Sequence, residues 1–176
     1  MLNYKMIGRL PESITLFRNG KPFSATRVSL GKMQVVDRAI QVADAAMIDE
    51  FPPLGVWLGN GEYAAYAYQW AHPSGIINIC AVLHIRPQRC CWTRRLSIPN
   101  DVRPDLAEGL IVDSGEISFK SANKTTLTSG FGDGYYPVFA NLNFGLWLQS
   151  LIVDFKIWEI GNVIHMPGHV LDEYGI

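Results

Sequence analysis

Hydrophobic and polar positions along most of the chain form short apolar or alternating runs rather than long helical stretches. β-branched and aromatic residues are frequent in these runs, and Gly, Pro, Asn and Ser separate them. We therefore expect strands at 56–58, 62–70, 76–85, 90–96, 110–112, 116–120, 135–140 and 146–157. A turn over 141–145 would join the last two strands as an antiparallel hairpin.

One segment, 37–47, has the spacing of a helix. Asp37 is a suitable N-cap, and Ile40, Ala43 and Met47 recur at helical intervals. The Phe-Pro-Pro sequence that begins at residue 51 would end the helix. This is the best helix candidate in the sequence.

The two ends of the chain carry weaker patterns than its middle. Residues 1–27 mix short apolar runs with Pro and Gly, which predicts an irregular lead with at most a short strand. The tail, 165–176, is predicted to be weakly ordered. With no internal repeat or linker, the sequence predicts a single mainly β domain over 1–176, with an antiparallel sandwich or barrel-like core and one or two short helices.

Composition and charge narrow the function classes. Apolar residues make up 48% of the 176 residues and charged residues 18%, so the chain can bury a core. A net charge of -1 creates no global field that would attract nucleic acid or acidic lipid. We find no apolar leader and no uninterrupted apolar stretch that could span a membrane, so a cytoplasmic location is expected.

The cysteines argue against a disulfide framework and against zinc. Cys80, Cys90 and Cys91 are an odd number, two of them adjacent, and they lack metal-ligand spacing. Buried free thiols in a reducing compartment explain them best. No metal and no cofactor is therefore expected.

Three aspartates follow or interrupt apolar runs: Asp113, Asp133 and Asp154. A carboxylate in such a place needs hydrogen-bond donors, because it is costly to bury alone. Turns explain Asp113 and Asp133, which neighbour Gly and Ser, whereas Asp154 lies within an apolar strand. Together the three are candidates for a catalytic or metal-binding group if folding brings them within a few ångströms of one another.

Two further segments have a functional and a structural interpretation. The glycine-rich segment 129–134 looks like a phosphate-binding loop, but a predicted strand and not a helix follows it, which favours a tight turn. The basic run 86–95, with Arg89 and Arg95, could contact nucleic acid or an acidic protein. Its alternation of polar and apolar residues favours an ordinary solvated strand face, so nucleic acid is not the expected partner.

Four segments in order resemble a bacterial domain of unknown function, the family numbered four two four one. They are a Gly-Lys strand ending in Asp at 31–37, then 112–115, 129–138 and 152–155. The chain departs from the family pattern at Arg38, where the family usually has proline, and at 52–57. The resemblance implies a small cytoplasmic β-rich protein without an established reaction. Some members are encoded near bacterial polymorphic toxin systems, which implies a toxin-neutralising role.

The first functional hypothesis is therefore a non-enzymatic protein-binding domain, in its narrower form an immunity protein that neutralises a cognate bacterial toxin. Aromatic and basic side chains would anchor the partner, and the candidates are Tyr135, Tyr136, Trp147, Trp158, Arg89 and Arg95. The alternative is a metal-dependent or hydrolase-like enzyme that uses the three aspartates. Whether the chain forms a homo-oligomer stays open.

Overall fold

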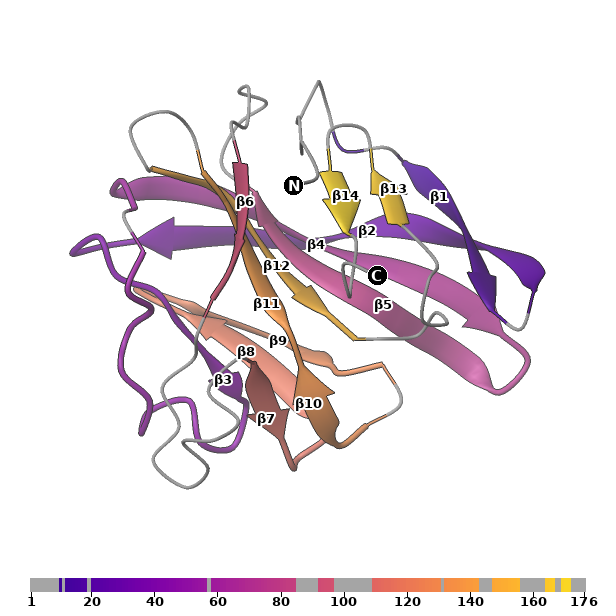
Figure 1. The fold of residues 1–176 in the computed structure, drawn as a ribbon. Helices are drawn as coiled ribbons and strands as arrows, with labels where there is room; N and C mark the ends of the chain where they lie inside the picture. The colour runs from indigo at the N-terminus through magenta and orange to yellow at the C-terminus, as the bar shows by residue number, and fades with distance from the viewer. Residues whose placement is uncertain are drawn as a thin grey trace.

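The protein is built from antiparallel β-sheets, as the sequence predicts. The computed structural model describes residues 10, 12–18, 20–56, 58–84, 92–96, 109–130, 132–142, 147–155, 164–166 and 169–171. Its largest sheet has seven strands, in the spatial order β1 (Ser13–Arg18), β2 (Lys21–Val35), β4 (Gly61–His72), β5 (Gly75–His84), β12 (Leu148–Asp154), β11 (Val138–Leu142) and β6 (Trp92–Arg95). This sheet twists strongly, so that β6 lies across the direction of β2 (Figure 1).

Three smaller sheets complete the fold. One has three strands, in the order β3 (Gln41–Asp44), β8 (Glu116–Lys120) and β9 (Lys124–Thr128). Two antiparallel two-stranded sheets pair β7 (Leu110–Val112) with β10 (Gly134–Tyr136), and β13 (Ile164–Met166) with β14 (His169–Leu171). In Figure 1 the three-stranded sheet and the β7–β10 pair lie on one side of the large sheet, and β13 and β14 lie near β1 at another edge.

The apolar core lies between the large sheet and the three-stranded sheet. Tyr63 and Met33 are cross-strand partners on the buried face of the large sheet, and Phe119 of β8 is fully buried. Asn78 of β5 crosses between the sheets, because its amide donates to the backbone oxygen of Thr128 at 2.8 Å. Burial of large side chains from both sheets is the main stabilising contribution, at about 25 cal/mol for each Å² of apolar surface removed from water.

The β8–β9 turn closes one side of the fold against β2. Strand β1 pairs with only the first part of β2, which leaves a free backbone edge near Gln34. Asn123 covers this edge: its Oδ1 accepts from the Gln34 N–H at 2.8 Å, and its amide donates to the Lys32 oxygen at 2.9 Å. An exposed strand edge is thereby satisfied and protected from pairing with another chain.

The predicted helix over 37–47 is wrong. Residues 37 and 38 form a turn, residues 41–44 are β3, and further turns occupy 45–50. The strand forms because Val42 and Ala43 are buried where β3 pairs with β8, and this tertiary pairing outweighs the helical preference of the alanines. No helix occurs in the described parts of the chain.

The irregular lead predicted for 1–27 is also wrong where the structure describes it. Strands β1 and β2 form a hairpin, and Gly20 at its turn has φ of 67°, a conformation that glycine adopts without strain. The long β2 strand was hard to recognise because its solvent-facing positions are polar and a register shift near Gly31 interrupts its alternation. Within the tail, β13 and β14 are strands that pair with each other.

The other predicted strands agree with the structure, apart from local differences. Residues 56 and 58 are not in a strand, and Pro137 divides the predicted strand 135–140 into β10 and β11 because proline cannot donate to a ladder. The predicted hairpin between 135–140 and 146–157 is present as the β11–β12 pair. Within the described ranges, no helix is long and apolar enough to cross a membrane.

Candidate functional site

A strained turn after β2 carries the most unusual backbone of the described chain. The Ala39 N–H donates to the Val36 oxygen at 3.1 Å, and the two residues between them, Asp37 and Arg38, have φ of 53° and 55°. Two positive φ values define a type I′ turn, which normally contains Asn-Gly or Gly-Gly. A left-handed conformation costs about 1–2 kcal/mol in a residue other than glycine, and Arg lacks the short polar side chain with which Asn or Asp residues can hydrogen-bond locally.

Side chains from two other segments hold this turn in place. The Arg38 N–H donates to Asn60 Oδ1 at 2.8 Å. Ser121 bridges the turn from the β8–β9 connection: its Oγ accepts from the Val36 N–H at 3.1 Å and donates to the Ala39 oxygen at 2.8 Å. A strained conformation persists only when its surroundings determine it in this way.

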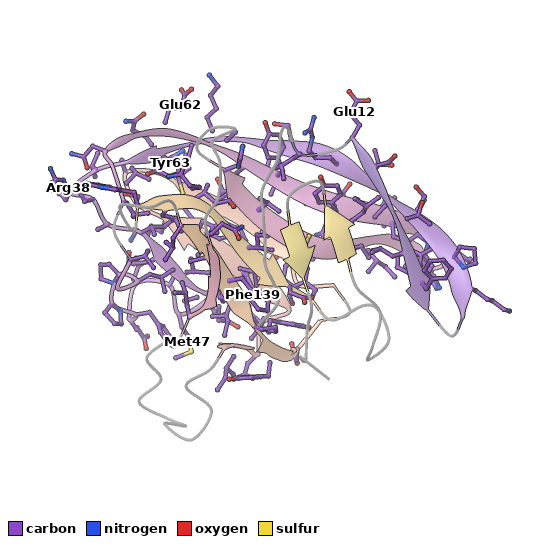
Figure 2. All side chains as sticks on the ribbon, turned by 45° about the horizontal axis from the view of Figure 1, so that its top comes forward. Glu12, Arg38, Met47, Glu62, Tyr63 and Phe139 are labelled. Carbon is purple, nitrogen blue, oxygen red and sulfur yellow. The ribbon has the colours of Figure 1, made fainter. Side chains whose placement is uncertain are left out.

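The turn places Arg38 at the rim of a pocket of about 280 Å³, which we call the Arg38 pocket. Its other described lining residues are Val56, Leu58 and Trp147. The guanidinium carbon of Arg38 lies 6.0 Å from the centre of the Trp147 ring, the outer limit for a cation–π contact. Figure 2 shows Arg38 at the periphery, at the end of the molecule where β4 begins with Glu62 and Tyr63.

The pocket wall is tied to the core on the side of β4. Leu58 is buried, and the Tyr63 hydroxyl donates to the Gly59 oxygen at 3.0 Å, which ties the segment before β4 to the core. Trp147 immediately precedes β12 and is 37% exposed, so its ring is available at the surface. The pocket therefore combines an apolar wall, an accessible indole and one cation.

The Arg38 guanidinium has no carboxylate partner among the residues that the structure describes. The nearby cation Lys32 differs, because its ammonium pairs with Glu62 at 2.7 Å. A guanidinium presents planar N–H donors that match a carboxylate in a two-point hydrogen bond. The arrangement suits recognition of an anionic group attached to an apolar body.

The three predicted aspartates do not form one cluster. Asp113 and Asp133 are both exposed and come together, since each directly follows or precedes the paired residues Val112 and Gly134. Asp154 is fully buried in β12, where its N–H donates to the Pro137 oxygen. Asp133 is exposed and Asp154 is enclosed in β12, so the Asp154 carboxyl does not share the surface on which Asp113 and Asp133 lie. No group of three potential metal ligands occurs within the described ranges.

The surroundings of Asp154 are those of a structural position in a sheet. Its cross-strand neighbours are Cys80 of β5 and, beyond it, Tyr68 of β4, and all three residues have no exposed surface. Burial, and then the charge of Asp154, raise the pKa of the Cys80 thiol. The thiol is therefore neutral at physiological pH and a poor nucleophile or metal ligand, as a buried free cysteine should be.

The residues predicted as aromatic and basic anchors lie in different surroundings. Trp147 lines the Arg38 pocket, Tyr135 is half-buried, and Tyr136 is buried, with its hydroxyl donating to the Gly132 oxygen at 2.7 Å. Arg95 lies in β6, of which the structure describes the backbone. Arg89 and Trp158 lie outside the described residues.

The glycine-rich segment forms a tight turn. Ser129 Oγ donates to the Gly132 oxygen at 2.6 Å, and Gly130 and Gly132 have φ of 60° and 110°. Strand β10 follows directly, so no helix N-terminus faces the loop as phosphate binding of this kind would require.

Arg38 is the candidate site residue that the sequence does not predict. The sequence signal was weak: two polar residues, Asp37 and Arg38, stand between apolar neighbours and lack the glycine that marks a type I′ turn. The sequence predicts a strand over 56–58, and this prediction gives no indication that Val56 and Leu58 line a pocket.

The chain matches no protein-family model, no curated protein and no solved structure. The resemblance to the bacterial family numbered four two four one accordingly stays a prediction.

Proposed function

We propose that this protein is a non-enzymatic binding domain that recognises a protein partner through the Arg38 pocket. Its narrower role would be neutralisation of a cognate bacterial toxin, as the family resemblance implies. One observation carries the proposal: an Arg38 guanidinium without a described carboxylate partner is held beside the exposed Trp147 at the rim of an apolar pocket. Arg and Trp are the residue types that most often dominate the binding energy of protein interfaces.

The proposal is consistent with the chemistry of the rest of the described chain. The carboxylates Asp113 and Asp133 are exposed at a turn, and the buried Cys80 thiol has a raised pKa. Neither arrangement activates a nucleophile, which would require an adjacent base or a lowered pKa. The described lining of the pocket, by contrast, offers binding contacts without a reactive group.

The experiment is co-expression of the full chain with the product of the neighbouring gene, followed by size-exclusion chromatography with light scattering. We expect a stoichiometric complex with the wild-type chain. Trp147→Ala and Arg38→Met should each weaken this complex at least tenfold, because each removes a central anchor.

A matched control uses an exposed apolar residue at the other end of the sheet. Ile76 is 63% exposed at the start of β5, so Ile76→Ser should leave the complex unchanged. A complex that survives both pocket substitutions would contradict the proposed site, and so would a complex lost only with Ile76→Ser. Thermal melts of each variant check that it folds.

The metal-dependent or hydrolase-like alternative has less support. Of the three predicted aspartates, only Asp113 and Asp133 lie close together, and both are exposed at the end of the short β7–β10 pair. A two-carboxylate site of this kind would need further ligands to hold a divalent cation.

A further inference from the structure

The Arg38 pocket has three properties that together restrict what can occupy it: a charge, an apolar wall and a small size. We propose, on the basis of the proposed function, that it receives the C-terminal residue of the partner protein. The α-carboxylate would pair with the Arg38 guanidinium, and an apolar side chain would lie among Val56, Leu58 and Trp147.

One compact group of the ligand must supply both an anion for the guanidinium and an apolar surface for the pocket wall. The guanidinium stands at the rim and the apolar side chains line the same pocket, within reach of a single residue. An Asp or Glu side chain supplies the anion but almost no apolar body. A C-terminal Leu or Phe supplies both, since its carboxylate and side chain leave the same Cα atom.

The size agrees with a single residue. A volume of about 280 Å³ is at or below the lower end of the roughly 300–1,000 Å³ range of sites for whole small-molecule ligands. Capture of a terminal carboxylate is also a known mode of peptide recognition, in which backbone N–H groups bind the anion; here the Arg38 guanidinium would supply the donors.

The strained turn is the independent argument that the Arg38 side chain is used. At φ of 55° glycine would be the more stable residue, and arginine gains only a marginal contact with Trp147 at 6.0 Å. The backbone hydrogen bond from the Arg38 N–H to Asn60 does not depend on the side chain. The fold therefore keeps Arg38 in an unfavourable backbone conformation, and this conformation sets the position of the guanidinium. Strain of this kind is typical of a binding site.

The test measures binding of three acetylated probe peptides by calorimetry. They are Gly-Ser-Gly-Phe with a free carboxylate, the same peptide with a C-terminal amide, and Gly-Ser-Gly-Gly with a free carboxylate. We expect the first to bind at least tenfold more tightly than either of the others. In Arg38→Gly the acid and the amide should bind equally, while the melting temperature of the protein increases by about 2 °C.

The matched control is Lys32→Ala, which removes a positive charge at the same end of the sheet but outside the pocket. It should preserve the preference for the free acid. Equal binding of acid and amide by the wild-type chain would overturn the inference, as would an Arg38→Gly variant that melts at a lower temperature. Binding of 3-phenylpropionate without binding of any peptide would assign the pocket to a small carboxylate instead, and would also overturn it.

Failure of this inference can be separated from failure of the proposed function. Deletion of the last residue of the partner should weaken the complex as much as Arg38→Gly does. If the complex is sensitive to Trp147→Ala but not to that deletion, the pocket binds the partner by another segment and only the C-terminal assignment fails. If neither change affects the complex, the proposed function fails as well.

Discussion

Two charged side chains, Asp44 and Arg38, lie at opposite ends of the same segment and have opposite surroundings. Asp44 is buried at the end of β3, and its carboxylate accepts three backbone N–H groups, from Ala46 at 2.8 Å, Asp113 at 2.7 Å and Ser114 at 2.8 Å. Arg38 is exposed, and its guanidinium has no described carboxylate partner. Hydrogen bonds from the fold satisfy the Asp44 carboxylate. The fold also fixes the backbone of Arg38, but no described carboxylate pairs with its guanidinium.

This difference separates a structural charge from one that can serve a ligand. Two of the three N–H donors around Asp44, those of Asp113 and Ser114, tie β3 to the turn that follows β7, so the carboxylate replaces backbone pairing that the chain cannot make there. The backbone around Arg38 is satisfied as well, by Asn60 and Ser121, but its side chain contributes little to that network. Removal of Asp44 should damage the fold, whereas removal of the Arg38 side chain should damage binding.

The largest effect is expected for Asp44→Ala. The substitution leaves three backbone N–H groups without their acceptor, and the free energy of unfolding should decrease by about 3 kcal/mol. Urea denaturation followed by circular dichroism measures this change. Asp49→Ala is the control, because Asp49 is an exposed carboxylate that pairs with Lys120, and its loss should change stability little. Equal effects of the two substitutions would remove the distinction drawn for Asp44.

A second effect is a dependence of stability on pH that comes from Asp44. Burial alone would raise the pKa of this carboxyl, but hydrogen bonds from Ser114, Ala46 and Asp113 together hold the pKa below its ordinary value of 3.8. A group whose pKa is lower in the folded state stabilises the protein above pH 3.8 and loses that contribution as pH falls toward the folded pKa.

Unfolding of the wild type and of Asp44→Asn at pH 6 and at pH 3 tests this dependence. The difference in stability between the two proteins should be largest at pH 6 and should shrink at pH 3. A difference that stays constant with pH would mean that Asp44 does not titrate in this range.

A smaller effect is expected for Asn60→Ala, which removes the acceptor of the Arg38 N–H. The free energy of unfolding should decrease by about 1 kcal/mol, and the turn should lose part of its restraint. Amide hydrogen exchange at residue 38 should then be faster than in the wild type. Unchanged exchange would show that Ser121 alone is sufficient to hold the turn.

The smallest effect, and the only gain in stability, is expected for Arg38→Gly. Relief of the left-handed conformation should stabilise the protein by about 0.5 kcal/mol, after allowance for the greater freedom of glycine in the unfolded chain. A thermal melt measures the gain. A gain in stability together with a loss of binding would show that Arg38 serves binding and Asp44 serves the fold. A loss of stability in Arg38→Gly would mean that both residues stabilise the fold.

Much of the fold could be predicted from local pattern. Strands β7 and β8 occupy the predicted residues, and β4 and β5 differ from the prediction only at their ends, because their apolar residues are β-branched or aromatic and glycine or proline bounds them. The segment 37–47 could not be predicted in this way. Its alanines favour a helix locally, yet Val42 and Ala43 are buried against β8, which is distant in the sequence.

The candidate site was only partly predictable for a similar reason. The sequence predicts Trp147 as a partner anchor because it is one of the aromatic residues at the aromatic-rich strand edges. It does not predict Arg38, Val56 and Leu58, since their proximity to Trp147 depends on the end of β2, the start of β4 and the start of β12 meeting at one end of the sheet.

The sequence by itself determined that this chain is a mainly β protein with a substantial core, because composition and alternation act over a few neighbouring residues. Only the tertiary structure decided which charges are satisfied. Asp44 finds two of its three donors about 70 residues away in the chain, and Arg38 is held beside Trp147 by a turn that glycine would adopt more readily. Hydrogen bonding and burial of a side chain depend on contacts between distant segments, so the local pattern could not distinguish these two residues.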